Sequence, residues 1–348
     1  MTSTLIRKSK LPFKSLVTIG ILPSFLKKII YRMKGYKIGK NVSLGFGAVI
    51  IGEKVVIEND VQIGLVTVIR AKEISIEQYA SIGSFTFIDT SKLRIGEDAR
   101  INEQVIIGGM QTPNSCLDLG KRTIIMEYSF INTTMPIIIG DDTGIGGHCL
   151  LFTHGSWLSC LDGFPVTFAP ITIGNNVWLP WRIFIMPGTV IGDNVVIGAN
   201  SLVSGTQPSN VLIAGNPAKI IRENYPPALK DDERKNILDN VFKEFCEYLI
   251  FNNCETQNKE NEIMKQYLIT SNKKPHALFY LKEHKPDVFA TPNGVVIQDY
   301  SCDLKKLSIA KKVLVANLQQ KERIGTSEVG EEFMKFLSRY GIRFSRLD

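Results

Sequence analysis

The sequence predicts a mainly β protein, a solenoid of short parallel strands with a helical segment before it and a small α/β part after it. Three observations predict this fold. Basic and apolar residues are mixed in the first 40 residues, an apolar residue recurs every six positions from 38 to 203, and helix-like and strand-like runs follow. A period of six fits neither the 3.6 residues of a helical turn nor the two-residue alternation of a strand. It is typical of a chain that forms a short strand, turns a corner and repeats.

The first element is a basic amphipathic segment, residues 1–35. Residues 1–40 contain ten Lys and Arg and no Asp or Glu, so this end accounts for the positive net charge of +7. The apolar run LVTIGILPSFLKKII is shorter than a membrane-spanning helix and is interrupted by Pro23. It also lacks the small-residue cleavage site of a signal peptide.

Two interpretations of this segment remain open. Basic, apolar segments bind the surface of an anionic membrane, here through residues 1–40. Alternatively, the segment packs as a helix over the open end of the solenoid. Nucleic acid is not an expected partner, because no recognised binding motif accompanies the charge.

The second element is the repeat region, residues 36–222. Its most regular stretch places apolar residues at Ile173, Leu179, Ile185, Ile191, Ile197 and Val203. Three hexads close one triangular coil, and neighbouring strands lie about 4.8 Å apart, so about nine coils would form a rod about 40 Å long. The core of this rod would be a stack of Ile, Leu and Val.

Corners and loops can also be located. Asn or Asp follows many hexad positions three residues later, at Asn41, Asp60, Asp98, Asp142, Asn176, Asn194 and Asn200. These side chains best tolerate the left-handed backbone that a corner requires. Two longer interruptions, 108–118 and 152–170, are expected to leave the rod as loops.

The block ITIGNNVWLPWRIFIMPGTVIGDNVVIGANSLVSGTQPSNVLIAGNPAKIIR, which begins at Ile171, resembles the terminal coils of hexapeptide-repeat acyltransferases. The segments NNVW, MPG, IGDN and AGNPAKIIR carry the resemblance, which extends over about residues 36–222. More narrowly, the block resembles the O-acetyltransferases typified by maltose and galactoside acetyltransferase, whose relatives modify bacterial surface polysaccharides. The resemblance implies a left-handed parallel β-helix, an exception to the usual right-handed crossover. It also implies a homotrimer with active sites between subunits.

The resemblance implies acetyl-CoA as the acyl donor and a carbohydrate as the acceptor. A sugar hydroxyl must lose its proton as it attacks a thioester, and a neutral imidazole is a suitable base. His154, in LLFTHGSW, matches the family's catalytic histidine, which follows a Thr at the end of a strand and opens a protruding loop. A histidine that only caps the loop is the alternative. We interpret His148 as a packing or surface residue at a corner.

A metal site is not expected. Zinc catalysis needs three protein ligands that converge on one point, as in the γ-class carbonic anhydrases, which share this fold. Residues six apart in the solenoid lie on faces turned by about 120°, since three hexads make one coil. His148 and His154 should therefore diverge, and the repeat region contains no third histidine.

The resemblance also places the substrates. Asn132, in FINTTM, resembles the family asparagine that contacts the acceptor, although an Asn that bonds its own backbone is equally compatible. The positions that match the donor site are Trp181, Ala199, Ser204, Gly205, Lys219 and Arg222. Backbone groups would hold the pantetheine, and the last two side chains would pair with the coenzyme phosphates. Trp181 stands where the family usually has a small residue and Gly205 where it often has Lys.

The repeats stop after Arg222. Apolar residues at helical spacing predict an amphipathic helix over 230–252, within a helical linker region over 223–270. The runs HALFYL, GVVIQDY and KVLVANL predict strands, and a helix over 328–340 ends at Gly341, so 271–348 is predicted to be a small α/β domain. Its residues suggest no chemistry, and His276 and His284 are expected at the surface. The six cysteines form no CxxC pair, which is typical of a reducing cytoplasm.

The sequence therefore predicts a cytoplasmic, coenzyme A-dependent O-acetyltransferase that acetylates a sugar hydroxyl of a bacterial surface polysaccharide or its precursor. His154 would be the general base, and backbone N–H groups would stabilise the oxyanion. If residues 1–40 bind lipid, the enzyme would lie on the inner face of the cell membrane. Two alternatives remain open: an N-acyltransferase acting on an amino-sugar nucleotide, and a non-catalytic solenoid scaffold whose carboxy-terminal domain binds a partner.

Overall fold

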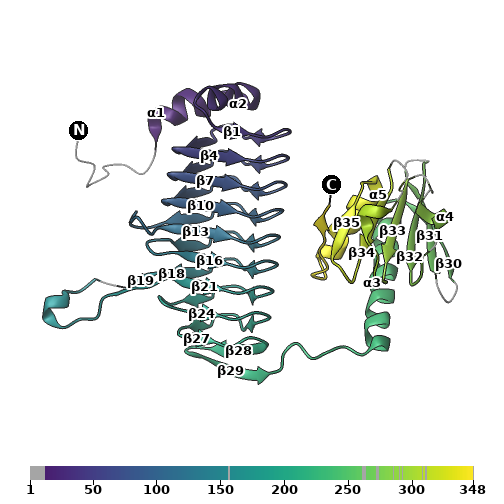
Figure 1. The fold of residues 1–348 in the computed structure, drawn as a ribbon. Coiled ribbons are helices and arrows are strands. Elements are labelled where there is room, and N and C mark those ends of the chain that lie inside the picture. The colour runs from purple at the N-terminus through teal and green to yellow at the C-terminus, as the bar shows by residue number, and fades with distance from the viewer. Residues whose placement is uncertain are drawn as a thin grey trace. The chain divides into compact units, whose positions relative to one another are not determined.

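The computed structural model describes residues 12–155, 157–260, 264–271, 274–284, 286–289, 291, 293–307, 309 and 312–347. The chain divides into two compact units, Met1–Pro227 and Ala228–Asp348, which we call the repeat unit and the carboxy-terminal unit. In the repeat unit, short strands stack coil upon coil, with helices at the end where the first coil lies (Figure 1). The expected β-solenoid is therefore present, and its left-handed sense stays a prediction.

Three sheets of parallel strands form the sides of the rod. The first has nine strands, β1 (Lys37–Ile38), β4 (Lys54–Ile57), β7 (Glu73–Ile76), β10 (Lys92–Ile95), β13 (Cys116–Leu119), β16 (Ile137–Ile139), β21 (Ile171–Ile173), β24 (Val190–Ile191) and β27 (Thr206–Gln207). The second has ten, β2 (Ser43–Leu44), β5 (Gln62–Ile63), β8 (Ser81–Ile82), β11 (Arg100–Ile101), β14 (Ile124–Ile125), β17 (Gly144–Ile145), β22 (Trp178–Leu179), β25 (Val196–Ile197), β28 (Val211–Gly215) and β29 (Ala218–Glu223). The third has eight, β3 (Val49–Ile51), β6 (Val68–Arg70), β9 (Phe87–Asp89), β12 (Ile106–Gly108), β15 (Phe130–Asn132), β18 (Leu150–Phe152), β23 (Phe184–Ile185) and β26 (Leu202–Val203). The last strand of the second sheet, β29, pairs antiparallel with β28.

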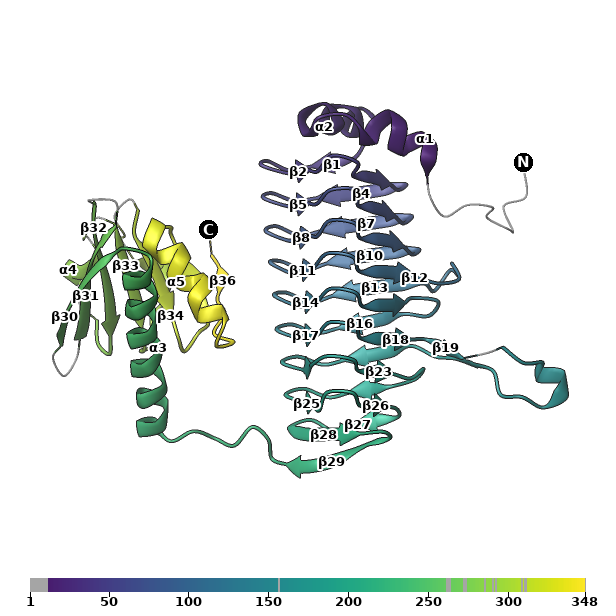
Figure 2. The same cartoon turned by 180° about the vertical axis from the view of Figure 1, so that it is seen from behind.

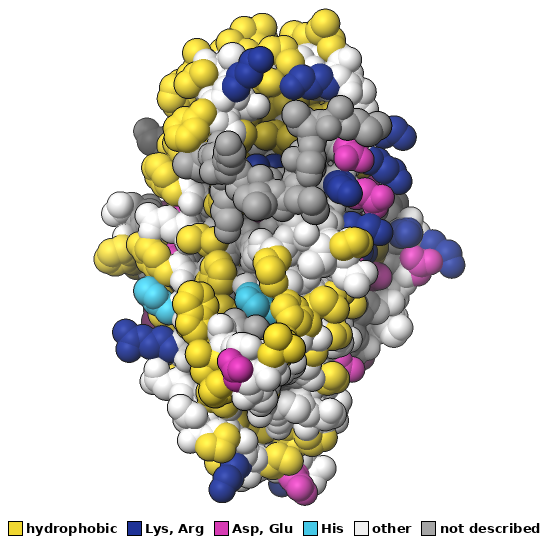
Figure 3. All heavy atoms as spheres, turned by 90° about the vertical axis from the view of Figure 1, so that its left-hand side faces the viewer, with side chains coloured by type: hydrophobic (Ala, Val, Ile, Leu, Met, Phe, Trp, Pro, Cys, Tyr) yellow, Lys and Arg dark blue, Asp and Glu magenta, His cyan; other side chains and the backbone are white. Residues whose placement is uncertain are grey.

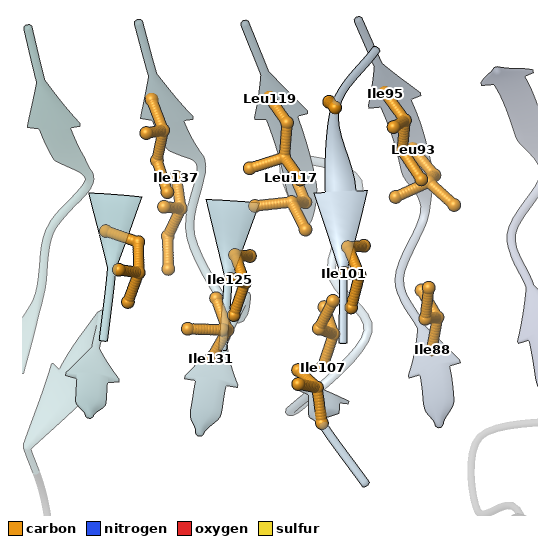
Figure 4. Packing of buried hydrophobic residues seen from close by; sticks show 14 of the residues in the cluster. Ile88, Leu93, Ile95, Ile101, Ile107, Leu117, Leu119, Ile125, Ile131 and Ile137 are labelled. Carbon is orange, nitrogen blue, oxygen red and sulfur yellow. The ribbon is translucent and has the colours of Figure 1, made fainter. Parts of the chain in front are cut away.

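The hexad residues form the core of this rod. From Ile173 to Val203 they expose at most 1% of their surface. Figure 4 shows the equivalent side chains of the middle coils, among them Ile88, Ile101 and Ile131, pointing into the interior. Because each apolar residue stacks on its counterparts in the coils before and after, one long core runs through the unit.

The corners have the backbone that the sequence predicts. All seven expected Asn and Asp residues have positive φ angles, between 52° and 60°. Corners also place other residues in this region, including Val66 at φ 51° and Phe85 at φ 58°, although β-branched and bulky residues rarely adopt it. The repeated hydrogen bonds between coils therefore override local preference at these positions.

Helices cover the first coil. They are α1 (Phe13–Ser15), the π-helix η1 (Leu16–Gly20) and α2 (Ser24–Met33). The fully buried Lys27 donates from Nζ to the carbonyl oxygens of Gly45 at 2.6 Å and Ala48 at 3.2 Å. The buried Tyr31 hydroxyl accepts from the backbone N–H of Ile50 at 2.8 Å, and burial raises the pKa of this phenol to about 12. These bonds satisfy backbone groups that the first coil would otherwise leave unpaired.

The carboxy-terminal unit contains one mixed sheet and two main helices. Its strands follow chain order, β30 (Glu255–Glu260), β31 (Met264–Ser271), β32 (Lys274–Leu281), β33 (Gly294–Gln298), β34 (Leu314–Asn317), β35 (Glu322–Ile324) and β36 (Ser345–Arg346). Its helices are α3 (Asp231–Phe251), α4 (Pro286–Phe289), the 3-10 helix η3 (Leu304–Lys306) and α5 (Glu328–Ser338). Phe245 of α3 packs on Phe333 of α5 with ring centroids 4.5 Å apart, within one apolar cluster that includes residues of the sheet.

Two expectations for this half differ from the structure. The predicted helix is α3, but it belongs to the carboxy-terminal unit, which begins at Ala228 rather than at 271, and residues 255–260 and 264–271 are strands. The sequence does not predict β30 as a strand because its residues are polar, and a strand at the edge of a sheet needs no apolar alternation. His276 is only 4% exposed, because β32 lies inside the sheet with apolar clusters on both faces. Its burial lowers the pKa of the imidazole. His284 is exposed, as expected.

Candidate active site

His154 lies where the chain leaves the rod. After β18, the segment β19 (His154–Gly155) pairs antiparallel with β20 (Thr167–Phe168), and the 3-10 helix η2 (Cys160–Asp162) lies between them. The resulting loop projects from the coils (Figure 2). The corner between the third and first sheets therefore holds His154 at the base of this protruding loop, as the sequence predicts.

The imidazole of His154 is held on two sides. Its ring stacks on Phe168 at 5.7 Å between centroids, with an interplanar angle of 14°. Its Nδ1 lies 3.3 Å from Oδ1 of Asn132, a side chain of the preceding coil that is only 4% exposed. The fold therefore brings into contact His154 and Asn132, two residues that the sequence predicts as site residues although they are 22 positions apart.

The surrounding bonds decide the tautomer of His154. The backbone N–H of Thr134 donates to Oδ1 of Asn132 at 3.2 Å, and the Thr134 hydroxyl lies 2.8 Å from the same atom. Because a backbone N–H only donates, the atom that faces His154 is the carbonyl oxygen of the amide, which only accepts. A neutral His154 in this arrangement carries its proton on Nδ1 and has its lone pair on Nε2.

The short loop after β12 closes over Asn132. A Cβ at Gly109 would lie 2.8 Å from Oδ1 of Asn132 and 2.6 Å from the Thr134 hydroxyl, so a larger residue there would displace these two side chains. The Thr153 hydroxyl donates to the carbonyl oxygen of Asn132 at 2.7 Å. Sequence reasoning missed Gly109 and Phe168, because neither has a signal in the hexad pattern. Thr153 could have been found from its place directly before His154.

Trp181 lies at a different corner, between the second and third sheets. Its indole covers Gly147 of the preceding coil, where a Cβ would lie 2.5 Å from the ring, and its centroid is 5.6 Å from that of His148. The ring of His148 also stacks on Tyr128 at 5.0 Å, so His148 is a packing residue at a corner, as expected. The bulk of Trp181 is thus accommodated by a glycine of its own chain, and 49% of its surface remains exposed.

The other predicted donor positions are spread over the last coils. Ala199 lies one coil beyond Trp181 at the same corner, because Trp178 pairs with Val196. Ser204 and Gly205 follow β26 at the corner that also holds His154, two coils further on. Gly205 has a φ of 67°, a backbone conformation that glycine adopts without strain.

Lys219 and Arg222 are exposed on β29 at the end of the rod. Within one chain, the structure therefore brings His154 and Asn132 together and leaves Trp181 and Ala199 at another corner. No group of three or more His, Cys, Asp or Glu side chains is arranged to hold a metal ion within the described ranges. The expectation of a metal-free site stays a prediction.

The repeat unit is similar in sequence to known proteins. Residues 170–205 match the family model described as bacterial transferase hexapeptide (six repeats). A putative colanic acid biosynthesis acetyltransferase of Escherichia coli is 30% identical over 130 residues, which is 36% of this chain and 69% of that protein. The chain belongs to the hexapeptide-repeat transferase family.

Two further relatives of this hexapeptide-repeat transferase come from the same organism. A putative lipopolysaccharide biosynthesis O-acetyl transferase is 36% identical over 110 residues, which is 28% of this chain and 56% of that protein. Galactoside O-acetyltransferase is 57% identical over 54 residues, which is 16% of this chain and 27% of the relative. The family expected from the NNVW, MPG and AGNPAKIIR segments is therefore confirmed.

Proposed function

We propose that this hexapeptide-repeat transferase moves an acetyl group from acetyl-CoA to a sugar hydroxyl of a bacterial surface polysaccharide or its precursor. The observation that carries the proposal is the hydrogen bond between His154 Nδ1 and Oδ1 of the buried Asn132, which leaves Nε2 of the neutral ring to accept the proton of a sugar hydroxyl. The two relatives named for lipopolysaccharide and colanic acid biosynthesis support the acceptor class.

His154 would act as general base. Nε2 takes the hydroxyl proton as the sugar oxygen attacks the carbonyl carbon of the thioester, and the imidazolium returns that proton to the departing sulfur. The amide oxygen of Asn132 stabilises the imidazolium, because both ring nitrogens then donate and Nδ1 already faces an acceptor. Asn132 is therefore a positioning residue in this proposal, and backbone N–H groups stabilise the oxyanion.

The separation of the donor positions supports a site that two chains share. Trp181 and Ala199 lie at the corner between the second and third sheets, whereas His154 lies at the corner between the third and first. We propose a homotrimer in which the His154 corner of one chain faces the Trp181 corner of its neighbour, with Lys219 and Arg222 available for the phosphates of the coenzyme.

The test is acetyl transfer from acetyl-CoA to a panel of glycans, read by mass spectrometry as the addition of one acetyl group. An amino-sugar nucleotide in the panel tests N-acylation, and no transfer to any acceptor together with no thioester hydrolysis would favour a scaffold. Asn132→Ala should lower kcat by about 10- to 100-fold, as does loss of a partner that orients a functional histidine. A substrate-binding role would instead raise KM and leave kcat unchanged.

A further inference from the structure

The amino-terminal helices and the turn between them expose a set of large apolar side chains, which we call the apolar stripe. Its members recur every fourth residue from α1 through η1 and the turn at Ile21 to the end of α2 and are 49% to 83% exposed: Phe13, Val17, Ile21, Phe25, Ile29 and Met33. Residues four apart on a helix lie on one face, so α2 presents Phe25, Ile29 and Met33 together. Figure 3 shows hydrophobic side chains gathered at this end of the molecule, with Lys or Arg among them.

Two lysines of α2 point the other way, into the first coil. Lys27 is fully buried and bonds two carbonyl oxygens, and Lys28 donates from Nζ to the carbonyl oxygen of Val42 at 3.0 Å. This is the reverse of the usual arrangement, in which a helix buries its apolar face and exposes its charged residues to water. Capping of the rod accounts for the inward lysines and leaves the apolar stripe unexplained.

The charges around the apolar stripe favour an anionic bilayer over a second copy of this chain as its binding partner. Lys14 in α1 and three lysines that follow α2, Lys34, Lys37 and Lys40, are exposed, and residues 1–40 contain no acidic side chain. A second copy of this face would bring like charges together, which disfavours self-association through the stripe. Apolar side chains beside cations are the combination that binds the interface of an anionic bilayer.

We infer that the apolar stripe inserts into the surface of an anionic lipid bilayer. None of the described helices is long and apolar enough to cross a membrane, so this contact is one made on the surface. The rod would then stand with its first coil nearest the lipid. The strand before His154, β18, is five strands from β3 in the third sheet, which places that corner about 24 Å further from the bilayer at about 4.8 Å a strand.

The test is co-sedimentation of the full chain with vesicles of phosphatidylcholine, with and without phosphatidylglycerol. We expect binding to the anionic vesicles to be at least about tenfold stronger at low salt and to weaken as salt rises. Ile21→Ser with Phe25→Ser and Ile29→Ser should lower that binding at least about tenfold, because the buried Lys27 and Tyr31 that hold the cap stay in place. The matched control is Ile250→Ser with Phe251→Ser, since these side chains are 57% and 85% exposed in the carboxy-terminal unit.

Equal binding by the triple variant, or no binding of the full chain to anionic vesicles at low salt, would overturn the inference. A drop in particle mass by light scattering in the triple variant, without a change in vesicle binding, would identify a second copy as the occupant instead. If the triple variant does not fold, Phe25→Trp keeps the stripe aromatic, and brominated lipids should quench its added fluorescence. Absence of quenching contradicts lipid contact. Acetyl transfer plays no part in these measurements, so they are independent of the proposed function.

Discussion

The repeat unit and the carboxy-terminal unit bury apolar residues through different kinds of contact. In the repeat unit, each buried residue lies opposite its counterpart one coil away, as Ile101 does between Ile82 and Ile125. In the carboxy-terminal unit, Phe245 packs on Phe333, which comes from a helix much later in the chain. The first kind of contact repeats along the chain and produces a period, whereas the second joins distant segments and leaves none.

The two units also differ in how they use polar side chains. In the repeat unit, a corner loop brings the half-buried His154 to Asn132, and we propose that its other ring nitrogen faces the substrate. In the carboxy-terminal unit, Arg234 and Tyr280 both donate to Asp299, and these bonds connect α3 to the sheet. We therefore expect substitution of these polar side chains to affect turnover in the first unit and stability in the second.

The largest expected effect is on turnover. His154→Gln should lower kcat by about 10²–10⁴, the usual contribution of a general base, without a loss of folding. His284→Gln is the matched control, because His284 is an exposed histidine of the other unit and should leave kcat unchanged. Steady-state kinetics with acetyl-CoA measure both variants. Turnover of His154→Gln within threefold of the original protein would remove this residue from the mechanism.

The next effect should fall on the carboxy-terminal unit alone. Phe245→Ala removes a fully buried ring and should cost about 3–5 kcal/mol in the free energy of unfolding of that unit. Since the two units have separate cores, we expect two transitions in a denaturant titration, and only one should move. Phe251→Ala, at a residue that is 85% exposed, is the control. Loss of turnover in folded Phe245→Ala would mean that the units are coupled.

Truncation inside the rod should affect the other transition. Ile101→Ala, at a residue that is 1% exposed, should cost about 2–5 kcal/mol in the free energy of unfolding of the repeat unit, because neighbouring coils cannot collapse into the cavity. Ile106→Ala removes a side chain of the same coil that is 48% exposed and should have little effect. Denaturant unfolding followed by circular dichroism compares the two. Equal destabilisation by both would contradict a continuous core.

The smallest expected effect is on the binding of the acyl donor, acetyl-CoA. If Trp181 covers the pantetheine of the neighbouring site, Trp181→Gly should raise the Kd for acetyl-CoA by about 2- to 10-fold, the equivalent of about 0.5–1.5 kcal/mol from one aromatic contact. Calorimetry measures this constant, and the oligomer should persist. Tighter binding in the variant would mean that the indole narrows the coenzyme channel.

Much of the repeat unit could be predicted because its core and corner residues recur at a fixed short spacing along the chain. Ile173, Leu179 and Ile185 follow one another at the spacing that buries them, and Asn176 stands where the corner requires a positive φ. His154 could be found because it directly follows the end of a strand in a recognisable segment. The same reasoning failed in the carboxy-terminal unit, where His276 is buried by neighbouring strands and by apolar clusters from other segments.

Periodicity and short motifs were sufficient for the solenoid, its corners, its family and the place of His154 at the base of a loop. Three features depended on contacts between coils or between helices and coils. The first is the position of the proton on neutral His154, which the buried Asn132 determines. The second is the packing of Trp181 over Gly147, and the third is the inward direction of the Lys27 side chain. A hydrogen bond between residues 22 positions apart, or a lysine that satisfies a carbonyl of the first coil, leaves no trace in the composition or spacing of neighbouring residues, because it depends on where the folded backbone returns.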